Sequence, residues 1–244
     1  MPAAGSKRPG WLARELQGKT PQEAVYGVLG PWLLASLENG ASLLGDGDVL
    51  FRGERWPRAA AMAHFALEEF GKCVIIISLV ANLVVESDID WRAYERDITG
   101  HTQKFSLANA VTVLDSHWPN GGLTDLTTAV ATFGEIAYRN SHRPLRERSL
   151  YVDLQNGDTV KPDASITRDD AYGYLGAGFA TLGALTKVVE GFASAINSLL
   201  ESSDKRMEYR RRHSEFITRQ REFVRRVKEE LPKLMSDLAL HNDQ

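Results

Sequence analysis

The sequence predicts an all-α protein, an antiparallel helical bundle with a short β-hairpin excursion. Three observations indicate this fold. Apolar residues recur with the 3.6-residue period of a helix along most of the 244 residues, whereas the alternation typical of strands is nearly absent. Helix-start signals precede several of these periodic segments. Clusters of Gly, Pro, Asn and Asp separate them.

The first two helices are marked by their ends. Thr20-Pro21-Gln22-Glu23 has the form of a capping box with proline at the first helical position, so a helix should begin there. Gly30-Pro31 should kink or restart it. It should end near Gly45, because Gly45-Asp46-Gly47-Asp48 has the composition of a polar loop. The second helix should span about residues 54–86.

A third helix is predicted from Asp88 or Asp90 to about Trp118, where a Pro-Asn-Gly-Gly sequence follows. A fourth should cover roughly residues 123–141. Beyond it, β-prone residues 149–154 and 159–161 flank an Asn-Gly pair, which predicts a hairpin. A lone hairpin is marginal in water, so this one should lean on the bundle.

The fifth helix should run from about Arg168 to Leu200, with Thr167 as its cap. Its glycines lower helix propensity but allow a neighbouring helix to approach closely. The last helix is expected at about residues 204–240, amphipathic and bent at Pro232. We interpret the whole chain, 1–244, as a single helical domain.

The last helix is also the most basic part of the chain. Residues 204–233 hold eleven Lys or Arg against six Asp or Glu, a local charge of +5, whereas the whole chain carries −3. Such a face suits a phosphate backbone or an acidic partner protein. A solvated amphipathic helix with interspersed acids explains the same pattern, and for this segment alone it is the better interpretation.

Composition favours a soluble, cytoplasmic protein. Hydrophobic residues make up 43% of the chain and charged residues 25%, which is the ordinary globular range. The longest apolar run, Cys73 to Val85, is shorter than the ~18 residues that a membrane span requires, and no apolar signal segment follows residues 1–10. Cys73 is the single cysteine, so it forms neither an internal disulfide nor a cysteine metal site.

The second predicted helix carries charges among apolar residues. Glu68 and Glu69 are followed by Lys72, with apolar residues on both flanks. Glu68 and Lys72 are i,i+4 neighbours in the favourable order, and His64 lies one turn earlier on the same stripe. An ionised group inside a protein is costly unless it is paired, so the charges indicate a function. The alternative is a stripe that faces water.

The third predicted helix carries the second polar group of interest. Arg96 and His101 are followed by Lys104. Imidazole exchanges protons near neutrality, and guanidinium binds phosphate oxygens in bidentate fashion. Together they are the minimum for cleaving RNA without a metal ion. Asp97 is i,i+4 to His101 and would fix its tautomer, but Arg96 and His101 lie about 140° apart on an unbroken helix. They converge only if the turn at Gly100 loosens, if the arginine reaches around, or if two copies meet across a two-fold axis.

These residues carry a family resemblance. The motifs are Glu68-Glu69-Phe70-Gly71-Lys72, His101-x-x-Lys104, and Leu150-Tyr151-Val152-Asp153 followed by Pro162. In this order they resemble the AbiV-type abortive infection proteins, a branch of the HEPN superfamily of helical domains, over about residues 31–200. The resemblance implies an anti-phage effector that cleaves RNA and stops translation, acting as a homodimer with an Arg-x4-6-His motif near the two-fold axis.

Arg96 and His101 match the Arg-x4-6-His motif of such ribonucleases, and Glu68 and Lys72 match their upstream Glu-x3-Lys motif. We expect His101 to be the general base, Arg96 and Lys104 the cations that face the phosphate, and Glu68 with Lys72 the pair that orients them. The expected supporting residues are Glu69, Asp97, His64, Tyr151 and Asp153, of which the last two resemble family positions without an assigned role. No cofactor and no metal are expected. The partners would be RNA, a second copy and a phage-encoded activator or antitoxin protein, with no membrane.

Two alternatives stay open. In a non-catalytic regulatory bundle, the Glu-Lys stripe would specify the core or a dimer interface, and the basic helix would dock a partner protein. An RNA-binding antitoxin would bind RNA in a salt-dependent way without cutting it. Tyr151 and Asp153 have a plain structural interpretation too, in which the tyrosine packs on the bundle and the aspartate ends a strand.

Overall fold

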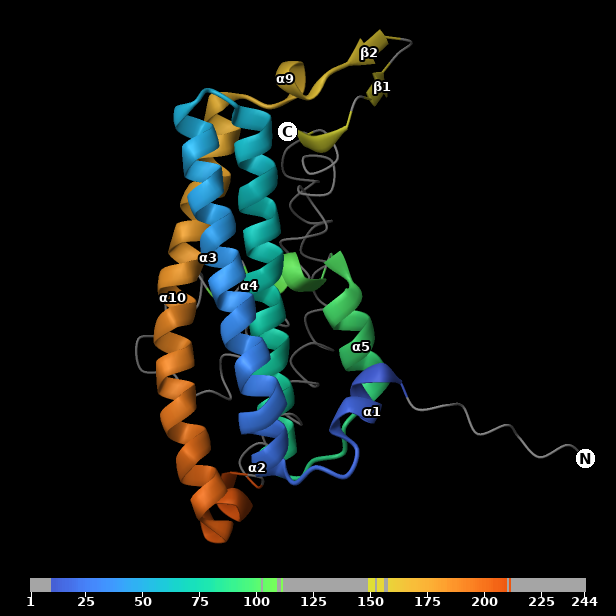
Figure 1. Ribbon diagram of the computed structural model, residues 1–244, viewed down its shortest axis with the longest axis vertical. Helices are drawn as coiled ribbons and strands as arrows, with labels where there is room; N and C mark the ends of the chain where they lie inside the picture. Colours follow the sequence, from blue (N-terminus) through green and yellow to red (C-terminus); the bar gives the residue numbers. More distant parts are fainter. Residues whose placement is uncertain are drawn as a thin grey trace, which may run out of the picture.

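Three long helices run side by side along the molecule: α3 (Gly30–Arg52), α4 (Trp56–Val84) and α10 (Arg168–Glu201) (Figure 1). The structure, a computed structural model, describes residues 10–101, 103–108, 111, 149–151, 153–155, 158–209 and 211. Helix α4 packs against both α3 and α10, and also contacts α5 (Trp91–Thr99). The predicted all-α class is confirmed.

Helix α4 is the centre of the core. Most of its residues are buried, including the alanines of its first half and the aliphatic run of its second half. Small side chains such as Ala59, Ala60 and Ala63 keep the neighbouring helices close, and Leu67 and Phe70 fill the space between them. Its bounds lie within two residues of the predicted 54–86. The charged residues on this helix therefore stand in a largely apolar surrounding.

The chain enters α3 through three short elements: α1 (Trp11–Leu16), α2 (Pro21–Ala24) and the π-helix η1 (Val25–Leu29). The predicted capping box is present, since the Thr20 side chain accepts from the Glu23 amide and the Glu23 carboxylate accepts from the Thr20 amide. Pro31 has no N–H and cannot donate a helical hydrogen bond. The sequence predicted a kink or a new helix start here, and the structure has a π-helical turn, Val25–Leu29, that leads directly into α3.

The predicted loop at Gly45–Asp48 is wrong, because α3 continues through it to Arg52. Gly47 is buried against α4 and α10, and a Cβ there would stand 2.9 Å from Leu175 Cδ2. This glycine serves helix packing, which outweighs its low helix propensity. Asp48 Oδ2 pairs with Arg52 Nη2 at 2.7 Å one turn later, which adds to the last turn of α3.

The third predicted helix is divided in two. Helix α5 begins after Asp90, whose side chain accepts from the Ala93 amide at 3.0 Å, and ends at Thr99. Gly100 is extended, with φ −76° and ψ 122°, and residues 101 and 103–108 are helical again. We call this second part the His101 helix. Thr99 Oγ1 donates hydrogen bonds to the carbonyl oxygens of Glu95 and Arg96. These bonds supply a donor to carbonyl groups in the last turn of α5. The fourth predicted helix, at 123–141, lies outside the described residues.

The predicted hairpin is present beyond one end of the long helices. Strand β1 (Asp153–Gln155) pairs antiparallel with β2 (Asp158–Val160), with Asp153 opposite Val160 and Gln155 opposite Asp158. It is shorter than predicted, because Ser149 and Leu150 are helical. Helix α9 (Pro162–Ser165) follows the hairpin and contacts α4, which ties this excursion to the bundle.

Helix α10 begins and ends as the sequence predicted, within one residue. Thr167 and Asp170 form a capping box at its start. At its other end Arg206 Nη1 donates to the carbonyls of Leu199 and Leu200 at 3.0 Å. By length and composition alone this helix would suffice to cross a membrane, and 28% of its apolar window is buried inside the protein. Residues 203–209 and 211 are helical, and the rest of the predicted basic helix lies outside the described residues.

Candidate active site

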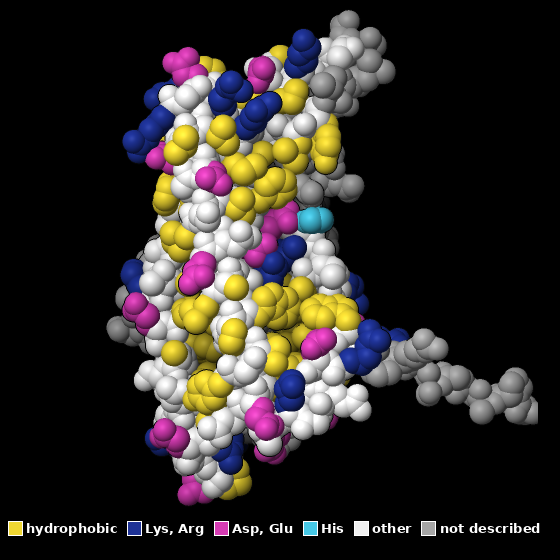
Figure 2. Space-filling view, in the orientation of Figure 1, with side chains coloured by type: hydrophobic (Ala, Val, Ile, Leu, Met, Phe, Trp, Pro, Cys, Tyr) yellow, Lys and Arg dark blue, Asp and Glu magenta, His cyan; other side chains and the backbone are white. Residues whose placement is uncertain are grey.

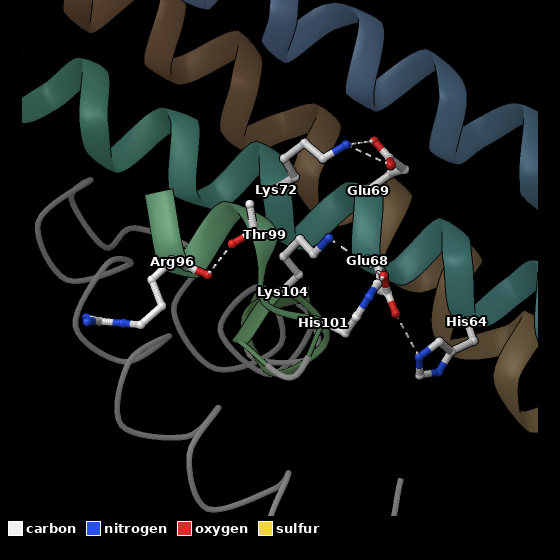
Figure 3. A network of polar contacts seen from close by, with 8 residues as sticks. All are labelled: His64, Glu68, Glu69, Lys72, Arg96, Thr99, His101 and Lys104. Carbon is white, nitrogen blue, oxygen red and sulfur yellow. Dashed lines mark hydrogen bonds and ion pairs between the residues drawn. The ribbon is translucent and has the colours of Figure 1, made fainter. Parts of the chain in front are cut away.

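One carboxylate on α4 gathers three nitrogen-bearing side chains. Glu68 Oε2 accepts a hydrogen bond from His101 Nδ1 at 2.6 Å and lies 3.7 Å from Lys104 Nζ. Its other oxygen, Oε1, lies 3.2 Å from His64 Nε2 (Figure 3). The Glu68 side chain is only 7% exposed. Two helices therefore supply one compact cluster, which we call the Glu68 cluster: His64 and Glu68 from α4, His101 and Lys104 from the His101 helix.

The electrostatics of the Glu68 cluster favour the ionised carboxylate. Burial by itself raises the pKa of Glu68 and is the largest single influence. The hydrogen bonds of His64 and His101, together with their charge interactions, outweigh burial and lower that pKa to about 2. Glu68 is therefore a negatively charged acceptor at neutral pH. An ionised carboxylate only accepts, so both facing imidazole nitrogens must carry protons.

His101 combines a fixed nitrogen with an accessible one. Its side chain is 56% exposed, although Nδ1 is engaged with the buried Glu68. Because Nδ1 carries the proton, a neutral imidazole here has its lone pair on Nε2. This is the arrangement in which a carboxylate orients an imidazole and stabilises the imidazolium that forms when Nε2 takes a proton. His101 can thus act as a general base.

His64 is the buried counterpart. The residue is 5% exposed, and its ring stacks on Phe105 with centroids 4.6 Å apart and an interplanar angle of 17°. Tyr174 from α10 lies beside both rings, at 6.2 Å from each. Among the described residues, His64 Nδ1 is buried without a hydrogen-bond partner. Phe105 was not singled out from the sequence, although its place four residues after His101 puts it on the same face of that helix.

The predicted Glu68–Lys72 pair is wrong. Lys72 Nζ donates instead to Glu69, at 2.7 Å from Oε1 and 2.6 Å from Oε2. Glu68 faces the His101 helix, whereas Glu69 and Lys72 lie on the outer side of α4 with 18% of each side chain exposed. Figure 2 shows acidic and basic side chains in the middle of this face, a histidine at their edge, and hydrophobic side chains above and below them.

Arg96 does not join its own His101. Its side chain is 74% exposed and points away from the Glu68 cluster (Figure 3), with Asp97 Oδ1 3.8 Å from its Nε. Asp97 was expected to fix the His101 tautomer, and this is wrong, because the extended Gly100 turns the chain between them. Glu68, from another helix, occupies that place.

Lys104 was expected to face the phosphate of a ligand, but its side chain is buried. Its side chain is 9% exposed and its ammonium faces Glu68, so it compensates the buried negative charge. Tyr151 is 61% exposed, so the interpretation in which it packs on the bundle is also wrong. Asp153 belongs to β1, beyond the end of the long helices in Figure 1, and its side chain lies outside the described residues. Neither residue is brought to the Glu68 cluster, since Glu68 lies near the middle of α4.

Within the described ranges no group of three His, Cys, Asp or Glu residues is arranged to hold a metal ion. A family model described as AbiV, of the HEPN_AbiV type, matches residues 32–178. This range includes α4, α5, the His101 helix and every residue of the Glu68 cluster. Comparisons with curated proteins and with solved structures gave no match.

Proposed function

The chain belongs to the AbiV family of HEPN proteins, and we propose that it is an abortive-infection effector that cleaves RNA without a metal ion. The observation that carries the proposal is the Glu68–His101 pair, in which a buried, ionised carboxylate holds an exposed imidazole. Such a pair is suited to moving a proton at a solvent-accessible atom. RNA offers a suitable acid, the 2′-hydroxyl next to each phosphodiester.

In the proposed reaction His101 Nε2 takes the proton of a 2′-hydroxyl. That oxygen forms a bond to the adjacent phosphorus, and the bond from phosphorus to the 5′-oxygen breaks. The leaving oxygen then receives a proton, from an imidazolium or from water. The products are a strand with a 2′,3′-cyclic phosphate and a strand with a free 5′-hydroxyl. Glu68 stabilises the imidazolium while it exists.

The transition state also needs a cation beside the phosphate. Lys104 faces Glu68 and Lys72 faces Glu69, so both ammonium groups are already paired with carboxylates. Arg96 is exposed but points away from its own His101. We propose that Arg96 of a second copy supplies the charge, in a homodimer whose two-fold axis passes near the His101 helices. In this arrangement the exposed Arg96, which points away from the Glu68 cluster of its own chain, would reach the cluster of the other chain.

The experiment is cleavage of total RNA by the purified protein in excess chelator, with the new ends mapped. We expect cyclic phosphate ends from the wild-type protein and none from His101→Ala, which should keep its fold and its oligomeric state because the side chain is largely exposed. His101→Ala should also remove toxicity in cells. A His101→Ala protein that cuts as well as the wild type would contradict the proposal.

Intact RNA after incubation with folded wild-type protein and with phage lysate would favour the non-catalytic interpretations. A salt-dependent RNA affinity without cleavage would then indicate an RNA-binding protein. Under either of these interpretations, His101→Ala should keep its biological activity.

A further inference from the structure

We propose that His64 is a positioning residue that acts on His101 through Glu68. The inference rests on the proposed function, because it concerns how the general base is held. It assigns the buried imidazole as the donor that fixes one carboxylate oxygen, so that the other oxygen stays directed at His101. His64 would touch neither RNA nor the reacting atoms.

The position of His64 is strongly constrained. It lies one turn before Glu68 on α4, which places Nε2 3.2 Å from Oε1. Its ring is stacked on Phe105 from the His101 helix and bordered by Tyr174 from α10. With 5% of the residue exposed, the ring has little space in which to turn. Three elements therefore hold this donor in place.

The donor in this contact follows from the chemistry of the two groups. An ionised carboxylate only accepts, so the His64 nitrogen that faces Oε1 at 3.2 Å, Nε2, must be the one that carries the proton. The other ring nitrogen, Nδ1, is buried and has no hydrogen-bond partner among the described residues. His64 therefore acts on Glu68 through Nε2.

Two nitrogen atoms lie near the other oxygen of Glu68. Oε2 faces both His101 Nδ1 at 2.6 Å and Lys104 Nζ at 3.7 Å. If the hold on Oε1 were lost, the carboxylate could rotate toward the lysine ammonium, and His101 would lose its fixed acceptor. The tautomer of His101 would then no longer be determined. Among the residues that the structure describes, the ionisable groups that face His64 and Glu68 include Lys104 and His101 from one helix and Tyr174 from α10.

The test compares two substitutions that differ in one donor. His64→Phe keeps a ring that can stack on Phe105 but has no N–H, whereas the terminal amide of His64→Gln can still donate to Glu68. The first readout is the ¹⁵N spectrum of the His101 ring, assigned with His101→Gln. The second is kcat and KM on an RNA with one cleavage site, measured across pH. Circular dichroism and size-exclusion chromatography control for folding and assembly.

For the wild type and His64→Gln we expect His101 to carry its proton on Nδ1. For His64→Phe we expect a mixture of both tautomers and a kcat about 10- to 100-fold lower, with KM nearly unchanged, which is the cost that losing an outer hydrogen-bond partner has at metal-bound histidines. His64→Gln should keep a kcat close to that of the wild type because it retains the donor. If His64→Phe fails to fold, His64→Met, which also lacks a donor, replaces it.

A folded His64→Phe protein with the wild-type tautomer and the wild-type kcat would overturn the inference. So would a loss in His64→Gln as large as in His64→Phe, since the ring and not the donor would then matter. The tautomer measurement needs no substrate. If the wild-type protein cuts no RNA, the proposed function fails, while the spectra still decide whether His64 controls His101.

Discussion

The backbone of Lys104 lies directly against Gly71, so that a Cβ on this glycine would overlap the Lys104 carbonyl oxygen. Glu68 stands three residues before Gly71, and His101 three residues before Lys104. The missing side chain thus lets the His101 helix cross α4 at backbone contact. This close crossing is what brings the imidazole within 2.6 Å of the buried carboxylate.

Substituting Gly71→Ala should therefore damage both stability and activity. The overlap involves backbone atoms, so one of the two helices must shift, which typically costs about 2 kcal/mol or more. A shift near 1 Å at the Glu68–His101 bond should lower the cleavage rate on the order of 100-fold. Urea unfolding and the RNA cleavage assay measure the two effects.

Gly45→Ala is the matched control. Gly45 also lies inside a helix, but a Cβ there would meet nothing within 4 Å. Alanine should leave the activity unchanged and raise stability by about 0.5–1 kcal/mol, because it favours the helix. Equal losses in the two variants would show that the crossing at Gly71 is not special.

Arg96 and His101 should complement each other between copies. A heterodimer of Arg96→Ala and His101→Ala chains, purified through two different tags, contains one complete site if the arginine acts across the interface. It should then have about half the activity of the wild-type dimer, although each parent homodimer is inactive. Cleavage per dimer is the measurement.

The reverse heterodimer separates the two arrangements. When a wild-type chain is paired with an Arg96→Ala, His101→Ala chain, an arginine that acts across the interface leaves no complete site. An arginine that serves its own chain leaves one. Activity in this heterodimer, combined with inactivity in the first, would place Arg96 beside its own His101 during the reaction.

The Glu68 cluster should make stability depend on pH in the acid range. The pKa of Glu68 is lowered from 4.5 to about 2 in the folded protein. Its charge therefore stabilises the fold fully above about pH 4.5, and this stabilisation is lost as the pH falls through about 2. Relative to Glu68→Gln, the wild type should be more stable by on the order of 3 kcal/mol at neutral pH.

This difference should shrink steadily in urea unfolding experiments as the pH is lowered below about 4.5. Glu38→Gln, on the exposed side of α3, is the control because Glu38 is remote from the cluster in the sequence and exposed. A pH-independent difference between wild type and Glu68→Gln would contradict the assigned ionisation of Glu68.

The pairing of Lys72 can be measured directly. A double-mutant cycle with Glu69→Gln and Lys72→Met should give a coupling energy of about 0.5–1 kcal/mol, because the two side chains are in contact and largely shielded from solvent. The same cycle with Glu68→Gln in place of Glu69→Gln should give a value near zero. A larger coupling energy for Glu68 and Lys72 than for Glu69 and Lys72 would support the i,i+4 pair that the sequence predicts.

Much of the fold could be predicted because its signals are local. The capping box at Thr20, the cap at Thr167, a helix start at Asp90 and the unbroken apolar length of α4 depend on neighbours within a few residues, and they were confirmed. The predicted loop at Gly45–Asp48 was wrong because α3 continues through it, with Gly47 buried against Leu175, a residue far away in the chain. Local composition contains no record of such a contact.

The sequence by itself determined that charged and titratable residues stand in a helix whose surroundings are apolar, and that His64, Glu68 and His101 belong to the candidate site. Only the tertiary structure decided the partners. A side chain's contacts within one helix follow from spacing, whereas contacts between helices depend on where the helices cross. Gly71 allows the close crossing that brings Glu68 to His101, in the place expected for Asp97. Because Glu68 is engaged across the helices, Lys72 pairs with Glu69 on its own helix instead.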